Sequence, residues 1–318
     1  MMKQLLFFLL LFSISTQSQD FSKVDELVAS YPKFSTAEAL SNQIKKDFTT
    51  NENKVRAAFY WLANNIRYNL KEYYNPTQRS YNFRYSTEEE KLQKLQALKD
   101  KLVAEAFKTK FGVCEEYAQA FKKVCDLLGI EAEVIKGNVR NVPQEIGKPE
   151  DTTNHAWNAV KLNQKWIILD ATWAAGYEYN GRWVKKFDNY FYNIPKEKIF
   201  KTHYPKDTIW VLRFGRMSIE EFYNQPIYGH TFLSSKVELV SPKKGILTIN
   251  SSKEIKLKFK NLDTNSPIFY TFRGQKYAQK PAVLVEGKTS TLTFKNAPKN
   301  SYLNLFINKE AALQFKTK

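Results

Sequence analysis

The chain has 318 residues, a formal charge of +17, 43% hydrophobic residues and 15% aromatic residues. This composition is typical of a folded globular chain and excludes a disordered one. Two cysteines are too few for a disulfide scaffold. The length suggests one large domain or two medium ones.

The N-terminal segment, MMKQLLFFLLLFSISTQSQD, reads as a secretory signal. Its apolar run, Leu5–Phe12, follows a basic residue and is about half as long as a membrane span. Thr16 and Ser18 provide the small residues that a signal peptidase reads, which predicts a signal peptide over 1–18 and cleavage before Gln19. An uncleaved anchor is the alternative. We therefore expect an exported protein, periplasmic or secreted, without a transmembrane segment after cleavage.

The first part of the mature chain alternates helical and strand-like patterns. Helices are predicted over Phe21–Ser30 and Thr36–Phe48, and a stronger amphipathic helix in NKVRAAFYWLANNIRYN. STEEEKLQKLQALKDKLVAEAF is another amphipathic helix, with leucines on one side. Strand-like segments follow: AEVIKGNVR, AWNAVKL, KWIILDATW and RWVKKFDNYF.

From about Lys236 the pattern changes to six or seven short alternating strands within about 80 residues, which suggests a β-sandwich of immunoglobulin-like size. We therefore predict an α+β domain over 19–235 and an all-β domain over 236–318. The second domain carries 15 Lys and one Arg against five acidic residues. This excess predicts contact with an anionic envelope component, with solvated lysines on strand faces as the alternative. No nucleic-acid recognition motif is visible, so nucleic acid is not expected as a partner.

Both cysteines lie in KFGVCEEYAQAFKKVCDLLGI, which predicts a helix that begins near Val113. Eleven residues of helix separate them by about 16 Å, too far for a disulfide. Cys125 shares a stripe with apolar residues and is predicted to lie in the core. Cys114 falls in the first helical turn, where free N–H groups and the helix dipole stabilise a thiolate. Glu115 and Glu116 would oppose this, and we expect their side chains to point away.

The segment NHAWNAVKLNQKWIILDATW predicts a β-hairpin with Asn163–Gln164 as its turn. A two-residue turn places Trp157 opposite Asp170, and His155 opposite Thr172. Opposed residues share one face of an antiparallel pair. His155 and Asp170 are therefore expected as diagonal neighbours on one face, within reach of a hydrogen bond.

These residues suggest a Cys–His–Asp triad. Cys114 would lose its proton to His155, and Asp170 would orient the imidazole and stabilise its charged form. The N–H of Cys114 could also donate to an oxyanion. The sequence has only three histidines, no i,i+4 histidine pair and no Cys-x-x-Cys, so neither a metal site nor a cofactor is expected.

The order of these elements resembles the transglutaminase-like superfamily. The matching features are the Gly-x-Cys helix start, the His-x-Trp-x-x-Val strand and the Trp-x-x-x-Asp-x-Thr-Trp strand. NYFYNIPKEKIFKTHYPKDTIWVL resembles the kyphoscoliosis-peptidase-like branch found in bacterial exported proteins. The resemblance implies a papain-like core, a helix bearing Cys114 packed on an antiparallel sheet, with His155 as general base and acid and Asp170 as orienter.

The same resemblance implies acyl transfer at amide bonds of protein or peptide substrates, by a thiol peptidase, an amidase or a protein cross-linker. The absence of a calcium-site pattern favours hydrolysis over cross-linking transglutaminase activity. A non-catalytic envelope-binding module, using the basic C-terminal domain, is the rival hypothesis.

Other aromatic and imidazole residues receive weaker predictions. Trp157 and Trp173 flank the expected site and would either wall a substrate cleft or pack in the core. His203 and His230 sit beside turn residues and aromatics, and structural hydrogen bonding is expected of them. A second oxyanion donor has no clear candidate, and either Tyr81 or Tyr85 would have to supply it.

Overall fold

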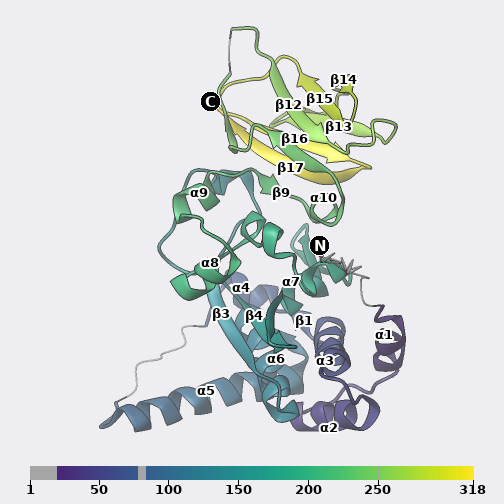
Figure 1. Cartoon of the computed structure of the whole chain (residues 1–318). Helices are drawn as coiled ribbons and strands as arrows, with labels where there is room; N and C mark the ends of the chain where they lie inside the picture. Colours follow the sequence, from purple (N-terminus) through teal and green to yellow (C-terminus); the bar gives the residue numbers. More distant parts are fainter. Residues whose placement is uncertain (1–19, 78–83, 250) are drawn as a thin grey trace, which may run out of the picture.

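A computed structural model describes residues 20–77, 84–249 and 251–318. The predicted signal segment 1–18 and Tyr81 lie outside these residues. Figure 1 shows an α+β domain below an all-β domain, which agrees with the predicted fold class. Within the described ranges, no helix is long and apolar enough to cross a membrane.

The predicted helices all form. Threonines at positions 36 and 50 cap the second and third by accepting backbone N–H groups, as helix N-caps do. The third helix is the best buried of the first three, in line with its apolar stripe. The helices of this region are α1 (Ser22–Ala29), α2 (Ala37–Asp47), α3 (Asn51–Asn65), α4 (Leu70–Tyr74), α5 (Glu88–Thr109) and α6 (Cys114–Leu128).

The first domain is built around a four-stranded antiparallel sheet in the order β5-β4-β3-β8. Helix α6 packs on the two central strands of this sheet. The strands are β3 (Ala132–Val139), β4 (His155–Leu162), β5 (Lys165–Leu169) and β8 (His203–Pro205). A second, two-stranded parallel sheet pairs β1 (Arg67–Tyr68) with β2 (Phe111–Gly112), directly before α6.

The predicted hairpin is the pair β4–β5. Leu162 pairs with Lys165, as the two-residue turn required. Asn163 and Gln164 have φ angles of 48° and 62°, the left-handed conformation of a type I′ turn. The predicted register along the hairpin is therefore confirmed as far as β5 extends.

Beyond Leu169 the prediction of a continuing strand is wrong. Asp170 is the N-cap of a short helix, α7 (Ala171–Ala175), and its carboxylate accepts the N–H groups of Thr172 and Trp173. Because the chain turns into a helix here, Thr172 does not pair with His155. The Asp170 carboxylate still lies on the predicted face of the sheet, beside His155, although the backbone of Asp170 no longer belongs to the strand.

Two buried polar side chains tie α6 to its surroundings. Asn158 of β4 donates to the carbonyl of Ala118 in α6 at 3.0 Å and to that of Glu133 in β3 at 3.2 Å. The hydroxyl of Tyr117 donates to the carbonyl of Ile66 at 2.6 Å. These bonds fix the helix on the sheet, and therefore fix the start of the helix relative to β4.

Gly137 lets three segments of this sheet approach closely. It pairs with His155 on one side and Pro205 on the other. A Cβ atom at this position would lie 2.6 Å from the Trp157 ring and 2.1 Å from the Tyr204 carbonyl oxygen. Only glycine leaves room for both.

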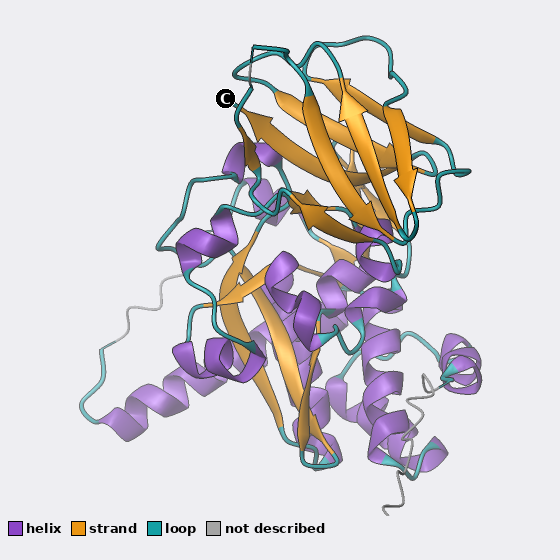
Figure 2. Cartoon of the chain, turned by 45° about the horizontal axis from the view of Figure 1, so that its top comes forward, coloured by secondary structure: helices purple, strands orange, loops and turns teal. Residues whose placement is uncertain are grey.

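The second domain is a sandwich of a four-stranded sheet and a five-stranded sheet, and Figure 2 shows them stacked; β9, from the connecting region, is the fifth strand and pairs with β17. One sheet has the order β10-β12-β15-β14 and the other β11-β17-β16-β13. In residues 236–249 and 251–318, eight strands form instead of six or seven, because Glu310–Thr317, interrupted by two alanines, was not recognised as a strand. The strands are β10 (Glu238–Ser241), β11 (Ile246–Leu247), β12 (Ile255–Lys260), β13 (Ile268–Phe272), β14 (Ala282–Glu286), β15 (Thr289–Phe294), β16 (Tyr302–Ile307) and β17 (Glu310–Thr317).

A connecting region joins the sheet of the first domain to the sandwich. Strand β9 pairs with β17, and helix α10 packs against the same strand. The buried guanidinium of Arg140 donates to the carbonyls of Tyr223 and Gln225 in this region. Its elements, from α7 onward, are β6 (Gly176–Tyr179), β7 (Arg182–Lys185), η2 (Asn189–Phe191), η3 (Lys196–Lys201), α8 (Thr208–Phe214), α9 (Ile219–Tyr223), β9 (Ile227–Tyr228) and α10 (His230–Ser234), while η1 (Pro143–Glu145) follows β3.

Candidate active site

Cys114 is the first residue of α6 and is partly exposed. The N–H groups of a helix's first turn have no partner within the helix, so they can donate to an anion formed at this position. The carboxylate of Glu116 accepts the N–H of Val113 at 3.0 Å, and that of Glu115 bonds Lys136 at 3.1 Å. Both acids are thus engaged with partners other than the thiol.

His155 and Asp170 meet as the hairpin register predicted. The imidazole Nε2 lies 2.7 Å from Asp170 Oδ2, and both side chains are buried. The Cys114 side chain acts on His155 as well and raises the pKa of its imidazole. Because Nε2 is occupied by Asp170, the ring nitrogen left for the thiol is Nδ1. The structure therefore brings the three predicted site residues together in the order thiol, imidazole, carboxylate.

The charges of this array reinforce one another. Burial alone would lower the pKa of His155, but the Asp170 carboxylate and the Cys114 side chain raise it to about 10. Burial opposes ionisation of Asp170, yet His155 and His203 hold the pKa of this carboxyl well below its usual range. At neutral pH the arrangement therefore favours an imidazolium beside an ionised carboxylate.

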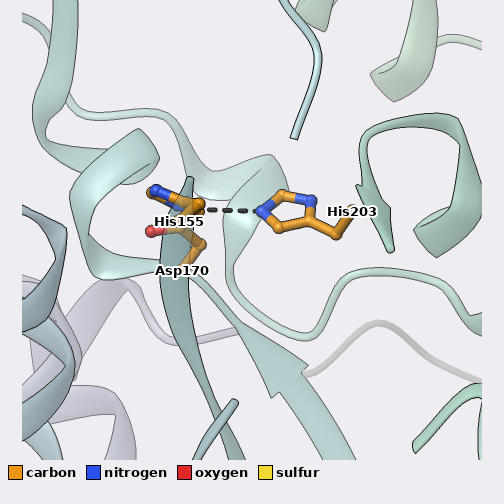
Figure 3. Close-up of side chains that lie close together, drawn as sticks. All are labelled: His155, Asp170 and His203. Atoms are coloured by element: carbon orange, nitrogen blue, oxygen red, sulfur yellow. Dashed lines mark hydrogen bonds and ion pairs between the residues drawn. The ribbon is translucent and has the colours of Figure 1, made fainter. Parts of the chain in front are cut away.

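His203 contacts the same carboxylate, which the sequence did not reveal. Its Nε2 lies 3.1 Å from Asp170 Oδ2, and its Nδ1 lies 2.7 Å from the hydroxyl of Thr202. Figure 3 shows the His203 ring directed toward the place where His155 and Asp170 lie together. The expected structural hydrogen bonding of His203 is confirmed, but its partner is the predicted orienter. Only the position of β8 beside β3 brings the two together.

The three groups His155, Asp170 and His203 could together hold a divalent ion, since one ligand atom from each lies within 4.8 Å of the others. Two imidazoles and a carboxylate are a donor set that suits zinc. The same atoms, however, already form a closed hydrogen-bond network, in which Oδ2 accepts two ring N–H groups and Oδ1 accepts two backbone N–H groups. The network accounts for these side chains without an ion.

An open pocket of about 320 Å³ lies beside Cys114. Tyr68 and Tyr73 line it together with Glu72, Pro76, Thr77, Val113 and the cysteine itself. Tyr68 ends β1 and pairs with Gly112, two residues before the thiol. Burial, with the charges of Cys114 and Asp170 adding to it, raises the pKa of Tyr68, so its hydroxyl stays protonated.

Tyr85, one of the two suggested oxyanion donors, is not among the residues that line this pocket. It is 47% exposed, and the ammonium of Lys91 lies over its ring. Tyr68 is therefore a better placed phenol than Tyr85. The sequence prediction extends the third helix through this residue, whereas the helix ends at Asn65 and Tyr68 lies in β1.

The two tryptophans of the predicted site differ in burial. Trp157 is 1% exposed and packs edge-on against His203 at 4.9 Å, so it belongs to the core and cannot wall a cleft. Trp173 is partly exposed, and its ring lies 5.7 Å from those of His155 and His230. His230 pairs with Asp188 at 3.3 Å, away from the carboxylate of Asp170.

Cys125 lies in the core, as its apolar stripe predicted. It has no exposed surface and belongs to the same hydrophobic cluster as Phe121 and Val124. Burial raises the pKa of its thiol strongly, so it stays protonated and unreactive.

Comparison with known proteins agrees with this geometry. Residues 38–171 match the family model of the Transglutaminase-like superfamily. This part of the chain is a transglutaminase-like domain. The matched range contains Cys114, His155 and Asp170, and ends one residue after the carboxylate.

Relatives share this domain at low identity. Human kyphoscoliosis peptidase is 22% identical over 264 residues, which cover 82% of this chain and 36% of the relative. Hillarin of Drosophila melanogaster is 28% identical over 138 residues, 39% of this chain and 17% of the relative. The chain therefore spans about a third of the human relative. A TGase crystal structure aligns over 58% of this chain and 40% of its own, at 18% identity and a TM-score of 0.30, too low to carry an argument.

Proposed function

We propose that this chain is a thiol-dependent acyl-transfer enzyme that hydrolyses amide bonds of protein or peptide substrates. The observation that carries the proposal is the hydrogen bond of 2.7 Å between His155 and Asp170, on a ring whose other nitrogen is left for Cys114. A thiol at a helix start beside an imidazolium is the arrangement that activates cysteine as a nucleophile.

The reaction follows from the positions of these groups. The Cys114 proton passes to His155 Nδ1, and the thiolate attacks the carbonyl carbon of the substrate. The N–H of Cys114 donates to the oxyanion, and the hydroxyl of Tyr68 is the second donor that we propose. His155 returns the proton to the leaving amine, which breaks the C–N bond and leaves a thioester. A water that gives its proton to His155 then hydrolyses the thioester and restores the thiol.

Selective labelling tests the activated thiol. Under reducing conditions at neutral pH, an alkylating probe should label the full chain once, at Cys114, and labelling should be slower by at least tenfold in His155→Ala. The matched control is His230→Ala, which removes an imidazole outside the array and should label at the rate of the unaltered chain. Equal labelling of His155→Ala and the unaltered chain would refute the proposal.

The acyl acceptor decides between hydrolysis and cross-linking. Incubation with a peptide library, followed by mass spectrometry, should trap an acyl group on Cys114 and identify the substrate. With excess primary amine present, free carboxylic acid as the main product supports hydrolysis. Amide formation with the amine would establish the transglutaminase alternative.

The basic sandwich is proposed as an attachment surface for an anionic envelope component, outside the cytoplasm. Its support is the charge excess of residues 236–318. In low-salt buffer, the amount of protein pulled down by anionic vesicles or cell-wall polymer should fall when the exposed lysines Lys256, Lys280 and Lys288 are changed together to Gln. Undiminished binding would refute it.

Export is tested by the N-terminal sequence of secreted protein, which should begin at Gln19.

A further inference from the structure

The Asp170 carboxylate is shared by two histidines that play unequal parts. Both Nε2 atoms approach Oδ2, His155 at 2.7 Å and His203 at 3.1 Å. An ionised carboxylate can only accept hydrogen bonds, so both nitrogens must carry a hydrogen. Asp170 and His203 have no exposed surface, and water cannot replace either bond.

We propose that His203 is a positioning residue of the catalytic array, a neutral imidazole whose Nε2–H donor fixes the Asp170 carboxylate and keeps it ionised. This inference rests on the proposed function of Cys114 and His155. It adds to the triad a fourth side chain that touches neither the thiol nor the substrate and acts through Asp170 alone.

Hydrogen bonding at Nδ1 allows a neutral His203. This nitrogen lies 2.7 Å from the Thr202 hydroxyl, which donates to it when the ring carries its hydrogen on Nε2 alone. The other acceptor within reach of this hydroxyl, the Ile199 carbonyl, is at 3.5 Å. Burial lowers the pKa of His203 and outweighs the opposing effect of the Asp170 carboxylate, and the charges of His155 and His230 lower this pKa further. A second imidazolium beside the first would therefore be unfavourable.

Few other groups packed around the carboxylate could donate a hydrogen bond to Asp170 Oδ2 in place of His203. The backbone N–H groups of Thr172 and Trp173 hold only Oδ1. The other titratable groups that act on this array are Cys114 and Tyr117 of α6, Tyr68 of β1 and His230 of α10. Of these, only His230 has ring N–H groups to offer, and it pairs with Asp188 instead. Removal of the His203 N–H would thus leave Oδ2 with His155 as its single donor.

The test compares His203→Phe, which keeps a ring but has no donor, with His203→Gln, whose amide can still donate. A hydrogen bond to a charged group corresponds to one to two pH units, or about tenfold to a hundredfold. In His203→Phe, the acid limb of the Cys114 alkylation rate should move up by about one pH unit. The kcat should fall at least about tenfold, and KM should change less than about twofold.

His203→Gln should restore most of both quantities. An unshifted acid limb with unchanged kcat in His203→Phe would overturn the inference. Equal loss in the Phe and Gln variants with an unshifted limb would also overturn it, since packing alone would explain that result. Loss of activity on chelation, with recovery on added zinc, would show that the cluster holds a metal instead.

A measurement on the unaltered chain covers the case in which a variant fails to fold. Nitrogen-15 spectra of only three imidazoles should show His203 neutral with hydrogen on Nε2 at neutral pH, and His155 protonated. A charged His203, or hydrogen on its Nδ1 alone, would refute the inference. If Cys114 proves unactivated while His203 has the expected form, the proposed function fails and the hydrogen-bond assignment does not.

Discussion

The two domains bury different kinds of side chain. The described part of the first domain buries arginine, glutamate, aspartate and histidine side chains, namely Arg56, Glu116, Arg140, His155, Asp170 and His203. In the described part of the sandwich, the buried polar residues are three hydroxyl side chains, Ser290, Ser301 and Thr317. Buried ionisable groups are costly unless partners compensate them. The contrast teaches that the sandwich is stabilised by regular apolar alternation. In the first domain, burial of the ionisable groups of the site lowers the free energy of unfolding unless their partners compensate for it.

The largest effect should come from the carboxylate that anchors the site. Asp170→Asn leaves the helix cap nearly isosteric but removes the negative charge beside His155. We expect kcat/KM to fall by about 10³-fold or more. Asp188→Asn is the matched control, because Asp188 also contacts a histidine, His230, outside the array. It should stay within about twofold of the unaltered chain, and comparable losses in both variants would contradict the assignment.

A second comparison removes one buried polar group from each domain. Asn158→Ala breaks one hydrogen bond to α6 and one to β3, and should lower the free energy of unfolding by about 1–3 kcal/mol. It should also slow the alkylation of Cys114. Ser301 is buried and its hydroxyl has no hydrogen-bond partner, so Ser301→Ala should change stability by less than about 0.5 kcal/mol. Denaturant unfolding measures both, and equal losses would remove the distinction.

The pH dependence of stability should also trace to the first domain. Folding raises the pKa of His155 from 6.5 to about 10, so its stabilisation is fully present below pH 6.5 and is lost as pH rises through about 10. In a Cys114→Ala background, which removes the thiol's own titration, unfolding free energy should therefore fall across this interval. The fall should be smaller when His155→Gln is added, and parallel curves would show that the His155–Asp170 pair is not the source.

The smallest effect is expected at the margin of the sandwich. Strand β14 ends its sheet, and Leu284 is 59% exposed. Leu284→Lys should change stability by less than about 0.5 kcal/mol and leave activity unaltered, because a lone exposed apolar residue contributes little. Thermal unfolding and the labelling rate of Cys114 check this, and a marked drop in either would show that β14 has a role in the fold that its exposure does not suggest.

Sequence patterns predicted most of the elements because the information they need is local. The period of apolar residues revealed α3, α5 and α6, and a two-residue turn fixed the register that joins His155 to Asp170. The same reasoning missed α7, since a capping aspartate after an apolar strand looks like the end of that strand. His203 was missed as a partner of Asp170 because β8 pairs with β3 over a long stretch of chain, and no local pattern encodes such a pairing.

The two cysteines of α6 have a practical consequence. A reagent should count one thiol in the native protein and two after denaturation, since Cys125 has no exposed surface. The rate at which the second thiol becomes available measures how often the core around it opens. Labelling of Cys114, at the first residue of α6, thus reports the reactivity of the site. Labelling of Cys125, three turns later in the same helix, reports unfolding, and one mass spectrum gives both.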